Sequence, residues 1–166
     1  MIVLIHDLQG DQAERLVAGY GKDTVVVSDD GSIKHCLGCF GCWTKEPGAC
    51  IIKDKYSSMG SLLGACRELH IVSECVYGGF SPFIKNVLDR SISYVHPDFR
   101  MREGKTHHRL RYDRPFQIYA WFYGDALTEN EQKTARELLV ANSINMGCPV
   151  AEVHFLEDIA GLEVTV

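Results

Sequence analysis

The amino-acid sequence predicts a doubly wound α/β fold, in which helices cover both faces of a five-stranded parallel sheet. Two observations predict it. Short apolar runs, typical of strands buried on both faces, alternate with segments of helical periodicity, and a fifth run closes the series. The 166 residues also suit one domain, spanning 1–166. For five strands the expected order across the sheet is 2-1-3-4-5, within three layers α/β/α.

The first three strands are expected at residues 2–5, 24–27 and 69–76, where the chain is continuously apolar. A helix is expected in each of the two intervals between them, and Asp54 is placed to cap the second. The inward-facing side chains recur at helical spacing: Ala13, Leu16, Val17 and Tyr20 in the first helix, and Tyr56, Met59, Leu63 and Cys66 in the second.

The second half of the chain carries clear helix signals. Ser81-Pro82 is typical of a helix start, with serine as cap and proline at the first helical position. Thr128 and Glu131 form a capping box that opens a helix reaching Met146. The last two strands are expected at residues 116–122 and 150–155, whereas residues 95–114 are polar, basic and irregular.

Composition excludes several function classes. The net charge is −5, from 17 basic and 22 acidic residues, which disfavours general nucleic-acid binding. The apolar runs are too short to span a membrane, and residues 1–5 lack the basic segment that begins an export signal. Seven cysteines without such a signal indicate the reducing cytoplasm, where clustered thiols more often bind metal or do redox chemistry than form structural bridges.

Four cysteines lie within fifteen residues, in the pattern C-x2-C-x2-C-x7-C. Because this segment follows the second strand, it is expected at the carboxyl edge of the sheet, where doubly wound folds bind ligands. The C-x2-C-x2-C spacing of the first three cysteines is ferredoxin-like and suits a [4Fe–4S] cluster. Zinc and free thiols, or a redox-sensitive disulfide, are the alternatives. The four candidate metal ligands are Cys36, Cys39, Cys42 and Cys50.

A glycine turn follows the third strand at the same edge. Gly78 and Gly79 would let backbone N–H groups approach a flat ligand closely, and Tyr77 could stack on its ring. Gly124 comes just after the fourth strand. The basic segment 96–114 is too long for a simple connection, so we expect an oligomer arm, a solvated flap or a site for the phosphates of NADPH.

Three groups of residues together resemble a known family. They are Cys36-x2-Cys39-x2-Cys42 with Gly48-x-Cys50, the turn from Tyr77 through Phe80 to Ser81, and Lys85-x3-Asp89-Arg90. This combination is similar to the NADPH-dependent FMN reductase and iron–sulfur flavoprotein group of the flavodoxin-like superfamily. The resemblance implies a [4Fe–4S] cluster on the four cysteines, NAD(P)H as co-substrate, a small-molecule or protein electron acceptor, and a homo-oligomer. It implies FMN near Tyr77, Gly78, Gly79, Phe80, Ser81 and Gly124.

One departure from that family keeps other functions open. Family members carry a Gly-Ser-x-Arg-like loop after the first strand for the FMN phosphate, whereas this chain has the acidic loop 7–11. The leading hypothesis is an FMN-dependent oxidoreductase, with no catalytic side chain assigned. The alternatives are a non-catalytic iron–sulfur electron carrier and a cofactor-free thiol redox sensor on the same scaffold.

Overall fold

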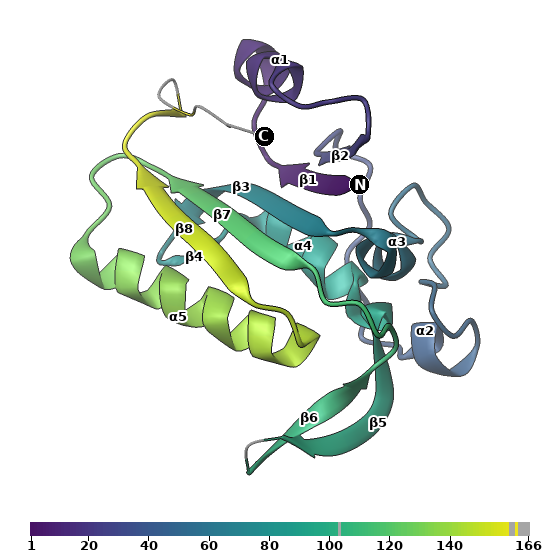
Figure 1. The fold of residues 1–166 in the computed structure, drawn as a ribbon. Coiled ribbons are helices and arrows are strands. Elements are labelled where there is room, and N and C mark those ends of the chain that lie inside the picture. The colour runs from purple at the N-terminus through teal and green to yellow at the C-terminus, as the bar shows by residue number, and fades with distance from the viewer. Residues whose placement is uncertain (103, 160–161, 163–166) are drawn as a thin grey trace.

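The computed structural model describes residues 1–102, 104–159 and 162, and its central sheet has the predicted order (Figure 1). Five parallel strands lie in the order β2-β1-β3-β7-β8, which is 2-1-3-4-5 for the long strands in chain order. A short strand, β4 (Gly79–Phe80), pairs antiparallel with the end of β3. The five strands are β1 (Ile2–His6), β2 (Thr24–Ser28), β3 (Glu68–Val76), β7 (Gln117–Tyr123) and β8 (Val150–Leu156).

Helices cover both faces of this sheet, as the alternation of strands and helices predicts. Inward-facing side chains of α3 (Met59–Ala65), α4 (Pro82–Arg90) and α5 (Glu129–Met146) pack with Val3 and Ile5 in the larger core cluster. Strand residues pointing the other way meet α1 (Gly10–Ala18), as Leu4 and Leu16 show. The three-layer α/β/α arrangement is therefore confirmed.

The local helix signals are also confirmed. Ser81 caps α4 by accepting a hydrogen bond from the Ile84 backbone N–H, and Thr128 with Glu131 forms the expected capping box of α5. The helix predicted from Asp54 is wrong at its start, because α3 begins only at Met59. The Asp54 carboxylate is instead a hydrogen-bond and ion-pair partner of the buried Arg90 side chain.

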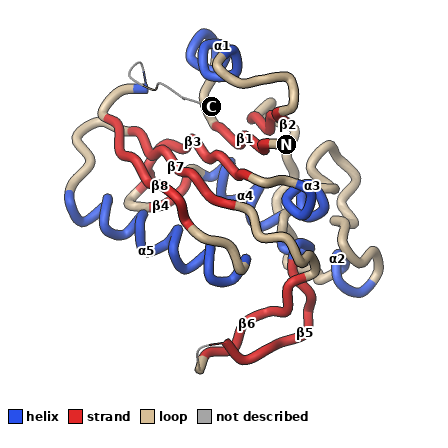
Figure 2. The backbone as a smooth tube through the Cα atoms, viewed as in Figure 1, coloured by secondary structure: helices blue, strands red, loops and turns tan. Residues whose placement is uncertain are grey.

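The segment predicted to be irregular contains a β-hairpin. The one-turn helix η1 (Ile92–Tyr94) leads into β5 (Val95–Arg102), which pairs antiparallel with β6 (Lys105–Leu110) (Figure 2). Gly104, at a φ of 75°, supplies the left-handed backbone of the turn. The hairpin pairs with itself and leaves most of its side chains exposed, so its strands lack the apolar pattern that core strands need.

None of the helices in the described part of the chain is both long enough and apolar enough to cross a membrane.

Candidate functional site

The carboxyl edge of the sheet is held together by the carboxylate of Asp7, which directly follows β1. Its Oδ2 accepts a hydrogen bond of 2.9 Å from the Glu74 backbone N–H, and its Oδ1 accepts one of 2.9 Å from the Tyr123 hydroxyl. Burial raises the pKa of Tyr123, and the charge of Asp7 raises it further. Asp7 thus joins the ends of three adjacent strands, and its negative charge is turned toward β3 and β7.

A cleft of about 510 Å³ opens at the same edge beside the start of α1. His6, the last residue of β1, lines it and is only 1% exposed, and neither ring nitrogen has a hydrogen-bond partner among the described residues. Burial lowers the pKa of His6, so its ring is neutral at neutral pH. A neutral imidazole carries one N–H donor, and both ring nitrogens of His6 are buried.

The start of α1 is open to the same cleft. Its N-cap residue, Gln9, makes no capping hydrogen bond through its side chain, and Gly10 (φ 54°) has no neighbouring atom within 4 Å of the position a Cβ would take, as far as the structure describes the chain. Uncapped N–H groups at a helix start attract anions. Asp11 in the first turn and Glu14 on the cleft wall add opposing negative charge.

The predicted cofactor residues after β3 divide into one exposed side chain and several structural positions. Tyr77 is 92% exposed and has a left-handed backbone, with φ of 51°. A Cβ on Gly78 would lie 2.8 Å from the Thr134 Cβ and 3.0 Å from the Glu131 carbonyl oxygen, so Gly78 is explained by the close approach of α5.

The other predicted positions of this set serve the fold as well. Phe80 is buried and stacks on Phe122, with ring centroids 5.2 Å apart. Ser81 is buried as the cap of α4, and Gly79 lies in β4. Gly124 donates its backbone N–H to the Leu156 carbonyl oxygen at 3.2 Å. Tyr77 is therefore the member of this set whose side chain is freely presented at the edge.

All four clustered cysteines line one pocket of about 200 Å³. Cys36 and Cys39 are exposed, whereas Cys42 and Cys50 are each 8% exposed. Burial raises the pKa of Cys42, and the neighbouring thiols, with Cys50 first, raise it further. Across the described residues, however, no three or more histidine, cysteine or acidic side chains stand in an arrangement that could hold a metal ion. The thiols as arranged do not fit the cluster implied by the resemblance, nor a zinc ion.

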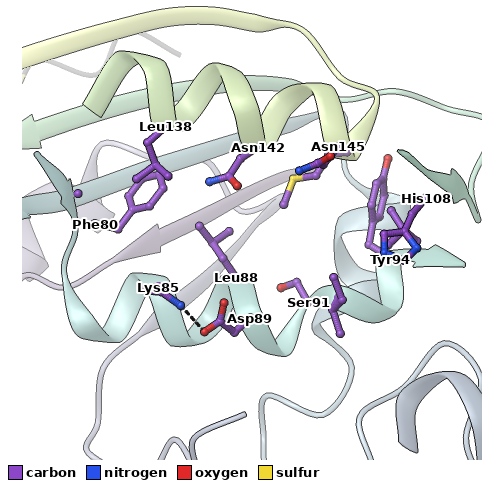
Figure 3. Close-up of a pocket in the computed structure, with 14 residues that line it drawn as sticks. Phe80, Lys85, Leu88, Asp89, Ser91, Tyr94, His108, Leu138, Asn142 and Asn145 are labelled. Atoms are coloured by element: carbon purple, nitrogen blue, oxygen red, sulfur yellow. Dashed lines mark hydrogen bonds and ion pairs between the residues drawn. The ribbon is translucent and has the colours of Figure 1, made fainter. Parts of the chain in front are cut away.

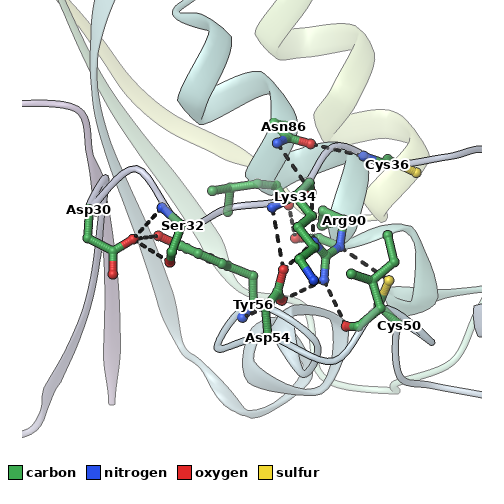
Figure 4. A network of polar contacts seen from close by, with 12 residues as sticks. Asp30, Ser32, Lys34, Cys36, Cys50, Asp54, Tyr56, Asn86 and Arg90 are labelled. Atoms are coloured by element: carbon green, nitrogen blue, oxygen red, sulfur yellow. Dashed lines mark hydrogen bonds and ion pairs between the residues drawn. The ribbon is translucent and has the colours of Figure 1, made fainter.

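Arg90 lines this cysteine pocket and stands at the centre of a network of polar contacts (Figure 4). Its side chain is fully buried and its Nε–H donates to Cys50 Sγ at 3.2 Å. The terminal nitrogens donate to Asp54 at 2.9 and 2.7 Å, and to the carbonyl oxygens of Lys34 and Ile52. Hydrogen bonds from Arg90 are the main cause that lowers the pKa of Asp54. The preceding residue, Asp89, forms an exposed ion pair with Lys85.

The cysteine pocket does not lie beside Tyr77, so its predicted place at the carboxyl edge is wrong. The chain leaves that edge after β2 and follows α4: the Cys36 backbone N–H donates to Asn86 and Cys50 contacts Arg90, the last residue of the helix. Arg90 lies about 12 Å along α4 from its first residue. Figure 1 shows α2 (Gly41–Thr44), which carries Cys42, on the opposite side of the molecule from β4. Local sequence fixes where a loop starts, but not the direction it takes.

A groove of about 440 Å³ runs between α4 and α5, starting at β4 (Figure 3). Phe80, Leu88 and Leu138 line it with apolar surface, Asn142 offers an amide, and His108 of the hairpin closes one end. Sequence reasoning missed this groove and the cleft at His6. A histidine ending an otherwise apolar buried strand is the signal that could have indicated the second.

Comparisons with known proteins identify the fold. Neither protein-family models nor curated protein sequences match this chain. Its structure is similar to a Trp repressor binding protein from Bacillus subtilis, with 13% identity, a TM-score of 0.56, and 95% of this chain and 88% of the other covered. It is also similar to the apo form of an NADH:FMN oxidoreductase, with 12% identity, a TM-score of 0.54 and coverages of 96% and 81%.

A third similar structure is an FMN-dependent NADH-azoreductase from Bacillus anthracis in complex with FMN. It has 9% identity and a TM-score of 0.54, and covers 93% of this chain and 84% of the other. At these identities the likeness concerns the arrangement of the chain. Together with the observed strand order, it shows that the protein has the flavodoxin-like fold.

Proposed function

We propose that this protein is an FMN-dependent oxidoreductase that takes a hydride from NAD(P)H and passes electrons to a small-molecule or protein acceptor. The observation that carries the proposal is the cleft at the carboxyl edge, where the buried and unpartnered His6 lies beside the open start of α1. Tyr77 is exposed at the same edge. Two of the structural neighbours, an NADH:FMN oxidoreductase and an FMN-dependent NADH-azoreductase, support the proposal.

Two kinds of hydrogen-bond donor around the cleft suit the phosphate end of FMN, while Asp11 and Glu14 oppose it with negative charge. Free N–H groups at the start of α1 and the single N–H of neutral His6 would meet phosphate oxygens. The acidic residue closest in sequence to His6, Asp7, does not oppose them directly, because its carboxylate is engaged by Glu74 and Tyr123. Tyr77 would stack on the flavin ring. The flavin, when bound, supplies the redox chemistry.

Comparing FMN with riboflavin tests this assignment, because riboflavin lacks the phosphate. The affinity for each flavin is measured by fluorescence titration with the wild type and with His6→Leu, which lacks the ring nitrogens. We expect FMN affinity to fall about tenfold, the effect of losing one hydrogen bond to a charged group. Riboflavin affinity should stay unchanged. His6→Gln, which keeps a donor, should restore part of the FMN affinity.

Tyr77→Ala gives the second arm and should weaken the binding of both flavins, because it removes the stacking side chain. Its matched control is Phe99→Ala, which deletes another exposed ring (66% exposed) on the hairpin and should change neither affinity. NAD(P)H oxidation in the presence of FMN is then followed at saturating flavin. The proposal would be refuted if FMN did not bind at concentrations up to about 1 mM, or if His6→Leu lowered the affinities for FMN and riboflavin equally.

A further inference from the structure

We propose that Cys50 is a peroxide-reactive thiol and that Cys42 is its resolving partner, so that the cysteine pocket is a site of oxidation by small hydroperoxides. Both cysteines line the pocket and are buried, and the buried Arg90 lines it too. The inference does not depend on flavin binding, because the pocket lies away from the carboxyl edge where the flavin is proposed to bind.

The contact between Arg90 and Cys50 carries the assignment of the reactive thiol. The thiolate is the nucleophilic form of cysteine, and a neighbouring guanidinium holds a thiolate by charge and by hydrogen bond. Arg90 Nε donates to Cys50 Sγ at 3.2 Å, while Asp54 fixes the terminal nitrogens of the same guanidinium. The donor is thereby held in place, and none of the other clustered thiols has such a contact among those found in the described residues.

Cys42 is the best-placed partner for Cys50. The two residues flank one tight segment, in which the Gly48 backbone N–H donates to the Cys42 carbonyl oxygen at 3.0 Å. Cys42 is as deeply buried as Cys50, and of the three neighbouring thiols Cys50 acts most strongly on it. A resolving thiol beside a reactive one is the arrangement found in redox-sensing cysteines.

The oxidation balances with one molecule of hydrogen peroxide. Once Cys50 is deprotonated, its sulfur attacks one peroxide oxygen, the O–O bond breaks, and the hydroxide that leaves takes up the released proton as water. Cys50 is then a sulfenic acid. The Cys42 sulfur attacks the Cys50 sulfur, the S–O bond breaks, and the hydroxyl leaves with the Cys42 proton as a second water. Two thiols lose two electrons, and the peroxide accepts them.

The size of the pocket selects the oxidant. About 200 Å³ admits several molecules the size of water, and therefore hydrogen peroxide. Bulky aromatic hydroperoxides such as cumene hydroperoxide, or disulfides such as oxidised glutathione, would meet the exposed Cys36 and Cys39 at the mouth first. Reaction at Cys50 should therefore distinguish small from large oxidants.

Peptide mapping tests the proposal in the flavin-free protein, reduced and handled without oxygen. One equivalent of hydrogen peroxide is added, remaining thiols are alkylated, and the protein is digested with trypsin. Cleavage after Lys34, Lys45 and Lys53 places Cys36, Cys39 and Cys42 in one peptide and Cys50 in the next. We expect a disulfide joining the two peptides through Cys42, with Cys36 and Cys39 alkylated, and no such link after treatment with cumene hydroperoxide.

Two isosteric variants and a control make the test decisive. Cys42→Ser should leave a sulfenic acid that a dione reagent traps on the Cys50 peptide, and Cys50→Ser should abolish both the link and the trapping. Cys66→Ser, outside the pocket, should behave as the wild type. A disulfide within the first peptide, a link through Cys36 or Cys39, or trapping on those two residues would overturn the proposal. Because flavin is absent, none of these outcomes bears on the FMN proposal.

Discussion

Replacing Asp54 by asparagine should destabilise the protein strongly, because it leaves the buried guanidinium of Arg90 without its counter-charge. The Arg90 side chain is 0% exposed and that of Asp54 is 9% exposed, and two hydrogen bonds of 2.9 and 2.7 Å join them. Breaking a buried ion pair at one partner costs about 3–5 kcal/mol. For a chain of this size each kcal/mol lowers Tm by about 2–4 °C, so a fall of roughly 6–20 °C is expected.

Urea unfolding followed by circular dichroism measures the free energy of unfolding of both proteins. The matched control is Asp89→Asn, which breaks the neighbouring but exposed pair with Lys85 and should cost no more than about 0.5 kcal/mol. A loss below about 1 kcal/mol in Asp54→Asn would show that Arg90 is not held by this carboxylate, and would refute the account of the buried ion pair.

The ion pair between Asp54 and Arg90 also determines how the free energy of unfolding changes with pH. Arg90 lowers the pKa of Asp54 in the folded state. The contribution of the pair to stability is therefore complete above the unfolded pKa of about 3.9 and is lost as the pH falls through the folded value. The difference in unfolding free energy between wild type and Asp54→Asn should stay constant from about pH 5 to 8 and shrink below about pH 4. A difference that shrank toward high pH would contradict this linkage.

Three further predictions concern packing, capping and charge. Gly60→Ala should cost about 1–3 kcal/mol in urea unfolding, because its Cβ would lie 2.8 Å from the Tyr94 backbone nitrogen, whereas Gly21→Ala, with open space, should cost nothing. Ser81→Ala should cost about 1 kcal/mol through loss of the α4 cap, and Ser81→Gly less. Asp11→Asn should strengthen FMN binding about two- to fivefold in fluorescence titration without changing riboflavin binding. An unchanged ratio of the FMN and riboflavin affinities would mean that the phosphate binds elsewhere.

The sequence was sufficient for features that arise from neighbouring residues or from one repeated pattern. Apolar runs predicted the five long strands to within a residue or two, and their alternation with helices predicted a parallel sheet. The number of strands then indicated the order 2-1-3-4-5. The caps at Ser81 and Thr128 form within one helical turn, so three or four residues specify them. In these places local chemistry and tertiary structure agree.

The sequence was insufficient where contacts join distant residues. Arg90 meets Cys50 and Asp54 across 40 and 36 positions, and Asp7 reaches Tyr123 across 116. No periodicity reports such pairs. Asp54 was predicted to cap a helix because aspartate is common at the N-cap, just before a segment of helical apolar periodicity. Its carboxylate instead pairs with the buried guanidinium of Arg90. The charged hairpin was missed because it packs little of its surface into a core.

The cysteine pocket and the proposed flavin site lie at different places on the molecule, so a redox role of the thiols is independent of the flavin. Thiols beside a flavin could exchange electrons with it, and their clustering would then support flavin binding. Here α4 separates the two places: its capped start lies at the turn after β3, and its last residue, Arg90, holds Cys50. The cysteines therefore give no support to the flavin proposal, which depends on His6, the start of α1 and Tyr77. In turn, the chemistry of Cys50 must be reached through the mouth of its own pocket, where Cys36 and Cys39 are exposed.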